Sequence, residues 1–411
     1  MRAIHNRTPV WLAGWQLISS RKLVSGWQLL LLLAVSSASG AAPYVPNNDT
    51  QVLERLPSSS RTANLRALQA AVSANPRDDA AAALLARGYF RLAIADGDPR
   101  YIGYAHAALA RWWSLTDAPT DILVARALVK QYGHDFSSAL ADLAQAGGRD
   151  PQSTEIWSWR AALHLVQADY ALARAACDGM KAHGPTLDVV ACETWVDGTT
   201  GRAGPAYDRF AAARRNARDL RQSDRLWFET RLAELALRAG RPREGERHFR
   251  AALTTGISDQ YLLAAYADFL LDANRAKEVT ALLAGWEAAD GLLLRLALAA
   301  QRQNAANRDA LSEQLRARFA AAAQRGDTLH QQEEARFLLH FGDDRAGALK
   351  LATANWSRQR EPRDARVLLA AALAVGDRAA AKPALDWLAR TAHEDAAIRD
   401  LADQLARLPS R

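Results

Sequence analysis

The best local grouping of reactive side chains in the sequence is His330 with Glu333, followed by His340. The first two residues lie about one turn apart in a segment with helical spacing, so one helix face could present an imidazole and a carboxylate. Both groups are metal ligands, but a stable site needs further ligands close by, and this segment supplies none. We therefore expect a solvated polar face here and not a metal site.

Motifs of common catalytic sites do not occur in the sequence. No glycine-rich phosphate loop precedes a helical segment, and the patterns GxSxG, HExxH and CxxC and paired-carboxylate motifs are missing. We predict no catalytic residue, no metal and no cofactor, and a protein that is not an enzyme. One alternative stays open: a hydrolase or transferase whose site is assembled from distant residues, with His330 and Glu333 as its first candidates.

The composition favours helices over strands. The chain has 411 residues, of which 49% are apolar, and alanine and leucine dominate while β-branched residues are sparse. Alanine and leucine lose little conformational freedom in a helix. A chain of this length fits two or three ordinary domains or one long repeat array.

The first forty residues differ from the rest. Four basic residues precede an apolar run at 29–35, and the small residues SSASGAA follow at 36–42. This order predicts a secretory signal peptide over 1–41, with an uncleaved amphipathic anchor as the alternative. The run is too short to span a bilayer, so we expect no membrane span after signal cleavage. No cysteine follows it, so we predict a periplasmic or secreted protein that is not a lipoprotein.

Charge and cysteine content narrow the expectations further. Formal net charge is +7, and four of these charges belong to the predicted leader, which leaves +3. No basic stripe with interleaved aromatic residues is visible, so nucleic-acid binding is not expected. The two cysteines, Cys177 and Cys192, would close a small loop if they paired, worth about 3 kcal/mol on the chain-entropy model. Two buried free thiols are the other possibility.

A signature recurs along the chain at a fixed interval. HDFSSALADLAQAGGRDP at 134–151 and ADYALARAACDGMKAHGP at 168–185 align with an offset of thirty-four residues. The aligned positions are Phe136 with Tyr170, Ala139 with Ala173, and Pro151 with Pro185. Segments 231–253 and 265–287 keep the same interval. A fixed period of this length predicts a solenoid.

Each unit has the pattern of a helix, a tight turn and a second helix. Gly240 or Asn274 ends the first helix, where a left-handed residue is favoured, and Pro242 stands at the start of the next. The recurrent small residue, Ala139 or Ala173, is expected where two helices cross most closely.

These features resemble the tetratricopeptide repeat family. The resemblance rests on the period, on the AxLxxxGxxxxAxxxFxxAL-like run at 233–253 and on the closing prolines. It implies an all-α solenoid, a right-handed superhelix of about nine helix pairs, over residues 61–411. A polar capping helix is expected at 394–407, and a linker with one short helix at 42–60 precedes the array.

The resemblance also implies that the first helix of each pair lines a concave groove that binds proteins or peptides. The groove positions expected from the register are Arg87, Arg91, Gln131, Tyr132, Glu234, Arg238, Tyr261, Asp268, Asp272, His330 and Glu333. This set mixes both charges, which suits a partner with charges of its own. Most of the twelve tryptophans are expected to pack between helices, with Trp159 or Trp227 as a possible sugar- or peptide-stacking platform.

The expected function is therefore a scaffold of the bacterial cell envelope that binds an unknown envelope protein or peptide in the groove. The alternative is a structural accessory subunit of an envelope export or polysaccharide-secretion machine.

Overall fold

The computed structural model describes residues 60–342 and 344–408, and this part of the chain is helical throughout, with twenty α-helices, one 3₁₀ helix and no strand. The signal peptide, the linker and its short helix predicted from the sequence lie outside the described residues. The helices are α2 (Ser60–Ala74), α3 (Asp79–Asp96), α4 (Arg100–Ala108), α5 (Thr120–Tyr132), α6 (Phe136–Arg149), α7 (Thr154–Val166), α8 (Tyr170–Met180), α9 (Thr186–Thr199), α10 (Ala203–Asn216), α11 (Gln222–Arg238), α12 (Pro242–Leu253), α13 (Gln260–Asp272), α14 (Ala276–Leu282), α15 (Asp290–Arg302), α16 (Arg308–Gln324), α17 (Gln331–Phe341), α18 (Arg345–Trp356), α19 (Pro362–Val375), α20 (Arg378–Thr391) and α21 (Ala396–Ala406).

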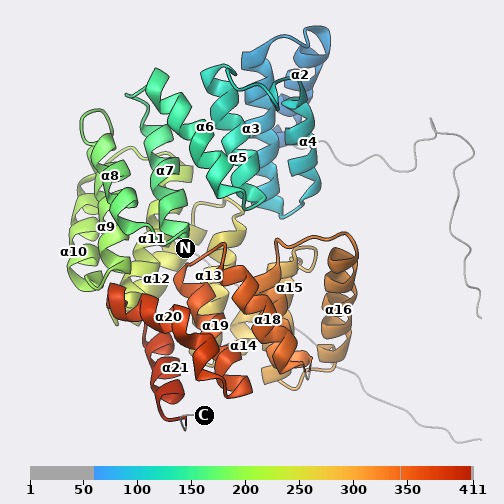
Figure 1. The fold of residues 1–411 in the computed structure, drawn as a ribbon, viewed down its shortest axis with the longest axis vertical. Coiled ribbons are helices and arrows are strands. Elements are labelled where there is room, and N and C mark those ends of the chain that lie inside the picture. The colour runs from blue at the N-terminus through green and yellow to red at the C-terminus, as the bar shows by residue number, and fades with distance from the viewer. Residues whose placement is uncertain (1–59, 343, 409–411) are drawn as a thin grey trace, which may run out of the picture. The chain divides into compact units, whose positions relative to one another are not determined.

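Consecutive helices pack against each other as nine pairs, from α3 with α4 to α19 with α20 (Figure 1). Helix α2 precedes the first pair and packs on α3, and α21 follows the last pair and packs mainly on α19. Neighbouring pairs also contact each other, as a stack in which no pair has to bury its apolar side alone. The predicted all-α array of about nine helix pairs is confirmed.

The turns within pairs use the residues that the sequence pattern indicates. Gly240 and Asn274 adopt left-handed conformations, with φ of 71° and 57°, after α11 and α13. Asn304 does the same after α15, with φ of 48°, so the segment that lacks a glycine still has a left-handed residue. Gly342 follows α17 with φ of −115°, so this turn does not use a left-handed residue at that position. Pro242 occupies the first turn of α12, where its missing N–H is not needed.

Small residues lie where helices approach most closely. Ala139 and Ala173 are both fully buried, as the repeat predicts. At Gly245, an added Cβ would lie 2.7 Å from Leu237 Cδ2 and 3.2 Å from the Ala233 carbonyl oxygen. A larger side chain at these positions would push the helix axes apart.

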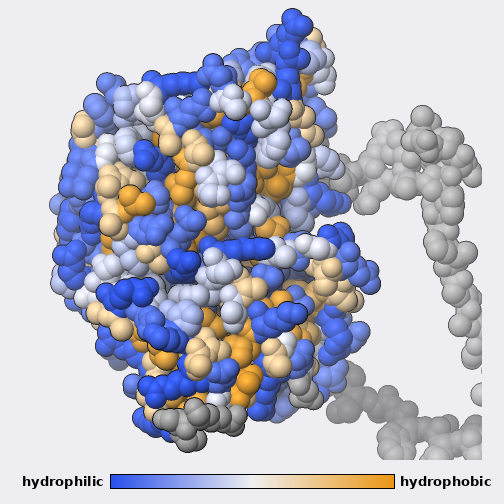
Figure 2. Space-filling model, viewed as in Figure 1, coloured by the Kyte–Doolittle hydropathy of each residue, from blue (hydrophilic) through white to orange (hydrophobic). Residues whose placement is uncertain are grey.

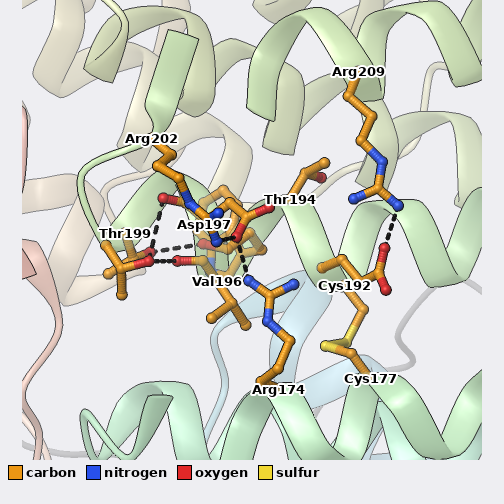
Figure 3. A network of polar contacts seen from close by, with 12 residues as sticks. Arg174, Cys177, Cys192, Thr194, Val196, Asp197, Thr199, Arg202 and Arg209 are labelled. Carbon is orange, nitrogen blue, oxygen red and sulfur yellow. Dashed lines mark hydrogen bonds and ion pairs between the residues drawn. A yellow bond between two sulfur atoms is a disulfide. The ribbon is translucent and has the colours of Figure 1, made fainter. Parts of the chain in front are cut away.

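A disulfide joins two neighbouring pairs. Cys177 of α8 bonds to Cys192 of α9, with Cα atoms 5.6 Å apart, and Figure 3 shows the bond below α9. Close by, Arg174 and Arg202 both donate to the Asp197 carboxylate. These contacts tie α8, α9 and the start of α10 together.

The C-terminal helices return to the first half of the array. Figure 1 shows them in red and orange against the green and yellow middle of the chain. The Trp387 indole, only 1% exposed, donates through Nε1 to the Tyr170 hydroxyl at 2.7 Å. The Arg360 amide donates to the Val166 carbonyl oxygen, also at 2.7 Å. The last two pairs therefore close against α7 and α8.

Residues just before α21 form the second part of this closure. His393 is fully buried and its Nδ1 lies 3.1 Å from the Thr199 carbonyl oxygen, while the Glu394 carboxylate accepts from the Ala203 amide. The segment 394–407, expected from the sequence to be a solvating cap, therefore does more than cover the end of the array. It connects the last pair to the turn between α9 and α10.

Replacing a small crossing residue should destabilise the fold. Ala139→Trp and Ala173→Trp should each lower the free energy of unfolding by about 1–3 kcal/mol, because the indole overpacks a closed helix crossing. The measurement is urea unfolding followed by circular dichroism. Ala317→Trp, on the exposed face of α16, is the control and should leave the midpoint nearly unchanged. Equal midpoints for all three variants would contradict this packing.

The closing contact can be tested with one hydroxyl. Tyr170→Phe leaves the Trp387 N–H buried without an acceptor and should cost about 1–3 kcal/mol in unfolding free energy. Tyr104→Phe is the matched control, because Tyr104 is 53% exposed. Hydrogen exchange should also rise in α20 of the Tyr170 variant. An unchanged exchange rate there would show that α20 is not held by this bond.

Candidate functional site

The helices surround a cavity of about 830 Å³ on the concave side of the array. Its walls come from α3, α5, α11, α12, α13, α15, α17 and α19, and from the start of α21. Eight of the eleven predicted groove residues line it: Tyr132, Glu234, Arg238, Tyr261, Asp268, Asp272, His330 and Glu333. The first helices of several pairs thus place these side chains around one space.

The other three predicted groove residues lie outside this cavity. Arg87 on α3 donates to both carboxylate oxygens of Glu155 on α7, at 2.7 and 2.8 Å. Arg91 is exposed and Gln131 is half-buried, and neither lines the cavity. The predicted groove positions are therefore divided between this cavity and the surface outside it.

Asp268 is the anchor of one cavity wall. Its carboxylate accepts from Arg295 at 2.5 Å and from Arg336 of α17 at 2.8 Å. Burial alone would raise the pKa of Asp268, but the attraction of the two guanidinium groups outweighs it and holds the pKa well below its usual range. Nearby, Asp272 pairs with Arg366 of α19 through two bonds of 2.7 Å. Two ion pairs therefore fix α17 and α19 to α13.

A second wall is built around a stacked arginine. The Arg231 guanidinium lies 4.3 Å from the Trp195 ring centroid and 4.6 Å from that of Tyr261. It donates to the Tyr261 hydroxyl at 2.8 Å, and that hydroxyl donates to Glu234 at 2.6 Å. Burial raises the pKa of Tyr261, so the phenol stays protonated and acts as a donor. The aromatic faces of this wall are already covered by an arginine.

The start of α19 completes this wall. Glu361 and Asp364 form a capping box, and the Asn355 amide donates to Asp364 at 2.9 Å. Arg363 pairs with Glu361 at 2.5 Å and, despite burial, lowers the pKa of that carboxyl. Burial raises the pKa of Asp364, which is only 2% exposed, to about 7. Asp364 supports the wall from behind and does not line the cavity.

Sequence reasoning missed the contribution of α19 and the arginine stack. Glu361, Arg363 and Arg366 line the cavity, and Trp195 and Arg231 support it, but none was among the predicted groove residues. The thirty-four-residue interval makes α19 the first helix of the ninth pair, so its outward positions could have been included.

The two tryptophans considered as stacking platforms differ. The Trp159 ring packs edge-on against Phe90, with centroids 6.0 Å apart. Trp227 is 41% exposed and its ring lies 5.2 Å from that of Phe228. Neither residue lines the cavity. On the face shown in Figure 2, apolar side chains occur as separate patches among hydrophilic ones.

No group of three His, Cys, Asp or Glu side chains within 60–342 and 344–408 is arranged as a metal site. His330 Nδ1 lies 4.0 Å from the nearest Glu333 carboxylate oxygen, and His330 immediately precedes α17. In the same part of the chain, no helix combines the length and hydropathy needed to cross a membrane.

The buried histidine at the closure predicts a pH dependence. Burial lowers the pKa of His393 to about 4, and its Nε2 has no hydrogen-bond partner among the described residues. In the unfolded chain the His393 imidazole binds a proton near pH 6.5, whereas in the folded protein it stays neutral down to about pH 4. The free energy of unfolding is therefore highest above pH 6.5. It falls as the pH drops toward 4, by about 1.4 kcal/mol per pH unit at most.

Urea unfolding between pH 7 and pH 4 measures this loss. His393→Gln should lose less stability over this interval than the wild type, and His183→Gln, at an exposed site, should follow the wild type. Parallel curves for all three proteins would contradict the assignment.

No protein-family model matches this chain, and a comparison with curated proteins gives no match. The likeness to tetratricopeptide repeats therefore stays a resemblance, and the fold is established by the helix pairs themselves.

Proposed function

We propose that this protein is a non-enzymatic binding protein of the cell envelope that holds a partner protein or peptide in the concave cavity. The observation that carries the proposal is the convergence of eight predicted groove residues on one space. These residues were chosen only by their positions on separate helices. That they lie around one cavity indicates that the first helices of the pairs form one common surface, the concave side.

The size of the cavity favours a peptide over a folded partner. Its volume of about 830 Å³ falls in the range of small-ligand and cofactor pockets. Helices α17, α19 and the start of α21 occupy the side from which a folded domain would dock. Carboxylates and guanidinium groups line the walls from α11, α13, α15 and α19, which suits a ligand that itself carries both charges.

The cell-envelope assignment is supported by two features. The sequence predicts a signal peptide, and the Cys177–Cys192 disulfide is typical of proteins that fold in oxidising compartments. The alternative role, an accessory subunit of a secretion machine, would use the outer surface of the array instead of the cavity.

Site-specific photocrosslinking in intact cells tests the proposal. A photoreactive residue replaces Ile94, which lines the cavity, or Ile257, which does not; each side chain is 38% exposed. Crosslinks should form from position 94 and not from position 257. The substitution Ala265→Phe, which fills part of the cavity, should abolish them.

Other outcomes have clear meanings. Crosslinks from position 257 alone would favour the accessory-subunit role. Equal crosslinking from both positions, insensitive to Ala265→Phe, would contradict binding in the cavity.

A further inference from the structure

The arginines that line the cavity are nearly all neutralised within the protein. Three of the four have a carboxylate at ion-pair distance: Arg295 with Asp268, Arg363 with Glu361, and Arg366 with Asp272. The fourth, Arg238, has no such carboxylate among the described residues. It donates to the Thr199 hydroxyl at 3.2 Å and stacks 4.2 Å from the Trp195 ring centroid.

Most carboxylates of the lining are likewise paired, with two exceptions. Five of the seven have an arginine at ion-pair distance: Glu234, Asp268, Asp272, Asp290 and Glu361. Asp395 accepts from the Ile398 amide at 3.0 Å, so the positive end of α21 offsets its charge. Among the described residues, Glu333 has only His330 at ion-pair distance, at 4.0 Å, although it also attracts Arg363 from farther away. One cation and one anion in the lining are thus left without a full partner.

A polar group of the same lining also lacks a partner. The Nε2 amide of Gln260, at the start of α13, is buried and has no hydrogen-bond acceptor among the described residues. It lies against Gly97, where α3 ends, and both residues line the cavity. A buried amide donor without an acceptor costs free energy that a ligand carbonyl would recover.

We infer that the cavity binds a short peptide with both ends free, whose carboxylate pairs with Arg238 and whose ammonium group pairs with Glu333. This inference rests on the proposed function and names its ligand. A peptide carbonyl would supply the acceptor that Gln260 lacks. The lining is then complementary to one small zwitterion, with each spare charge neutralised.

Other ligand classes fit these groups less well. A purely cationic ligand would leave Arg238 without a carboxylate partner. A purely anionic ligand would leave Glu333 unpaired. A neutral sugar would use neither charge, and the ring of Tyr261 in the lining already lies under Arg231.

Isothermal titration calorimetry with the full mature chain tests the inference. The probes are trialanine with free ends, N-acetyl-trialanine and trialanine amide, which differ only in the charge of one terminus. A fourth probe, N-acetyl-Lys-Ala-Glu-amide, carries both charges on side chains and neither at a terminus. Trialanine should bind at least tenfold more tightly than each of the other three.

Two variants assign each end to its residue. In Arg238→Gln the preference for the free acid over the amide should disappear, while the preference for the free amine remains. In Glu333→Gln the reverse is expected. Glu313→Gln and Arg316→Gln, at an exposed pair on α16, are matched controls and should keep both preferences. Circular dichroism checks that each variant is folded.

Several results would overturn the inference. The comparison of free and blocked probes uses only the wild-type protein, so it remains decisive even if a variant does not fold. Equal binding of free and blocked trialanine would overturn the inference, and so would binding of the side-chain zwitterion alone. If no probe bound while position 94 still crosslinked a partner, the proposed function would stand and this ligand assignment would fall. If neither binding nor crosslinking occurred, both would fall.

Discussion

The structure depends on one constraint: two short helices cannot bury their apolar faces by themselves. Each pair must therefore stack on the next, and fully buried residues such as Phe210, Phe249 and Leu292 fill the space between neighbours. Small residues at the crossings set how closely the helices approach. The last pairs reach α8 and α9, and side chains from both halves of the array line one cavity.

Ion pairs join several walls of that cavity. Asp268 and Asp272 hold arginines from α15, α17 and α19, so helices far apart in the sequence meet at one carboxylate-rich face of α13. Buried ion pairs add little net stability, since desolvation offsets most of their attraction. They instead fix geometry, because a planar guanidinium can satisfy its N–H donors in few orientations relative to a carboxylate. The unpaired Arg238 and Glu333 stand out against this background because almost every other charge in the lining is satisfied.

Two buried groups respond to acid in opposite ways. His393 is kept neutral by burial, so protonation opposes the closure between the end of α20 and α9. Asp364 is also buried, and burial raises its pKa to about 7, so protonation favours the folded state between its unfolded pKa and that value. The first group sits where the chain closes, and the second supports α19 behind the cavity. A lower pH therefore weakens the closure at His393 and strengthens the cavity wall at Asp364.

The sequence by itself determined the local structure. The thirty-four-residue interval predicted the helix pairs, Gly240 and Asn274 marked the turns, and Ala139 and Ala173 marked the close crossings, because each depends on residues within one or two turns. Register on the first helices also identified eight of the residues that line the cavity. Only the tertiary structure decided which side chains lie opposite these positions. Asp272 and Arg366, for example, form an ion pair although they lie ninety-four residues apart in sequence. Their contact depends on how all the intervening helix pairs pack, and no local spacing encodes that. The pairing of Cys177 with Cys192 was likewise open until packing brought their Cα atoms to 5.6 Å.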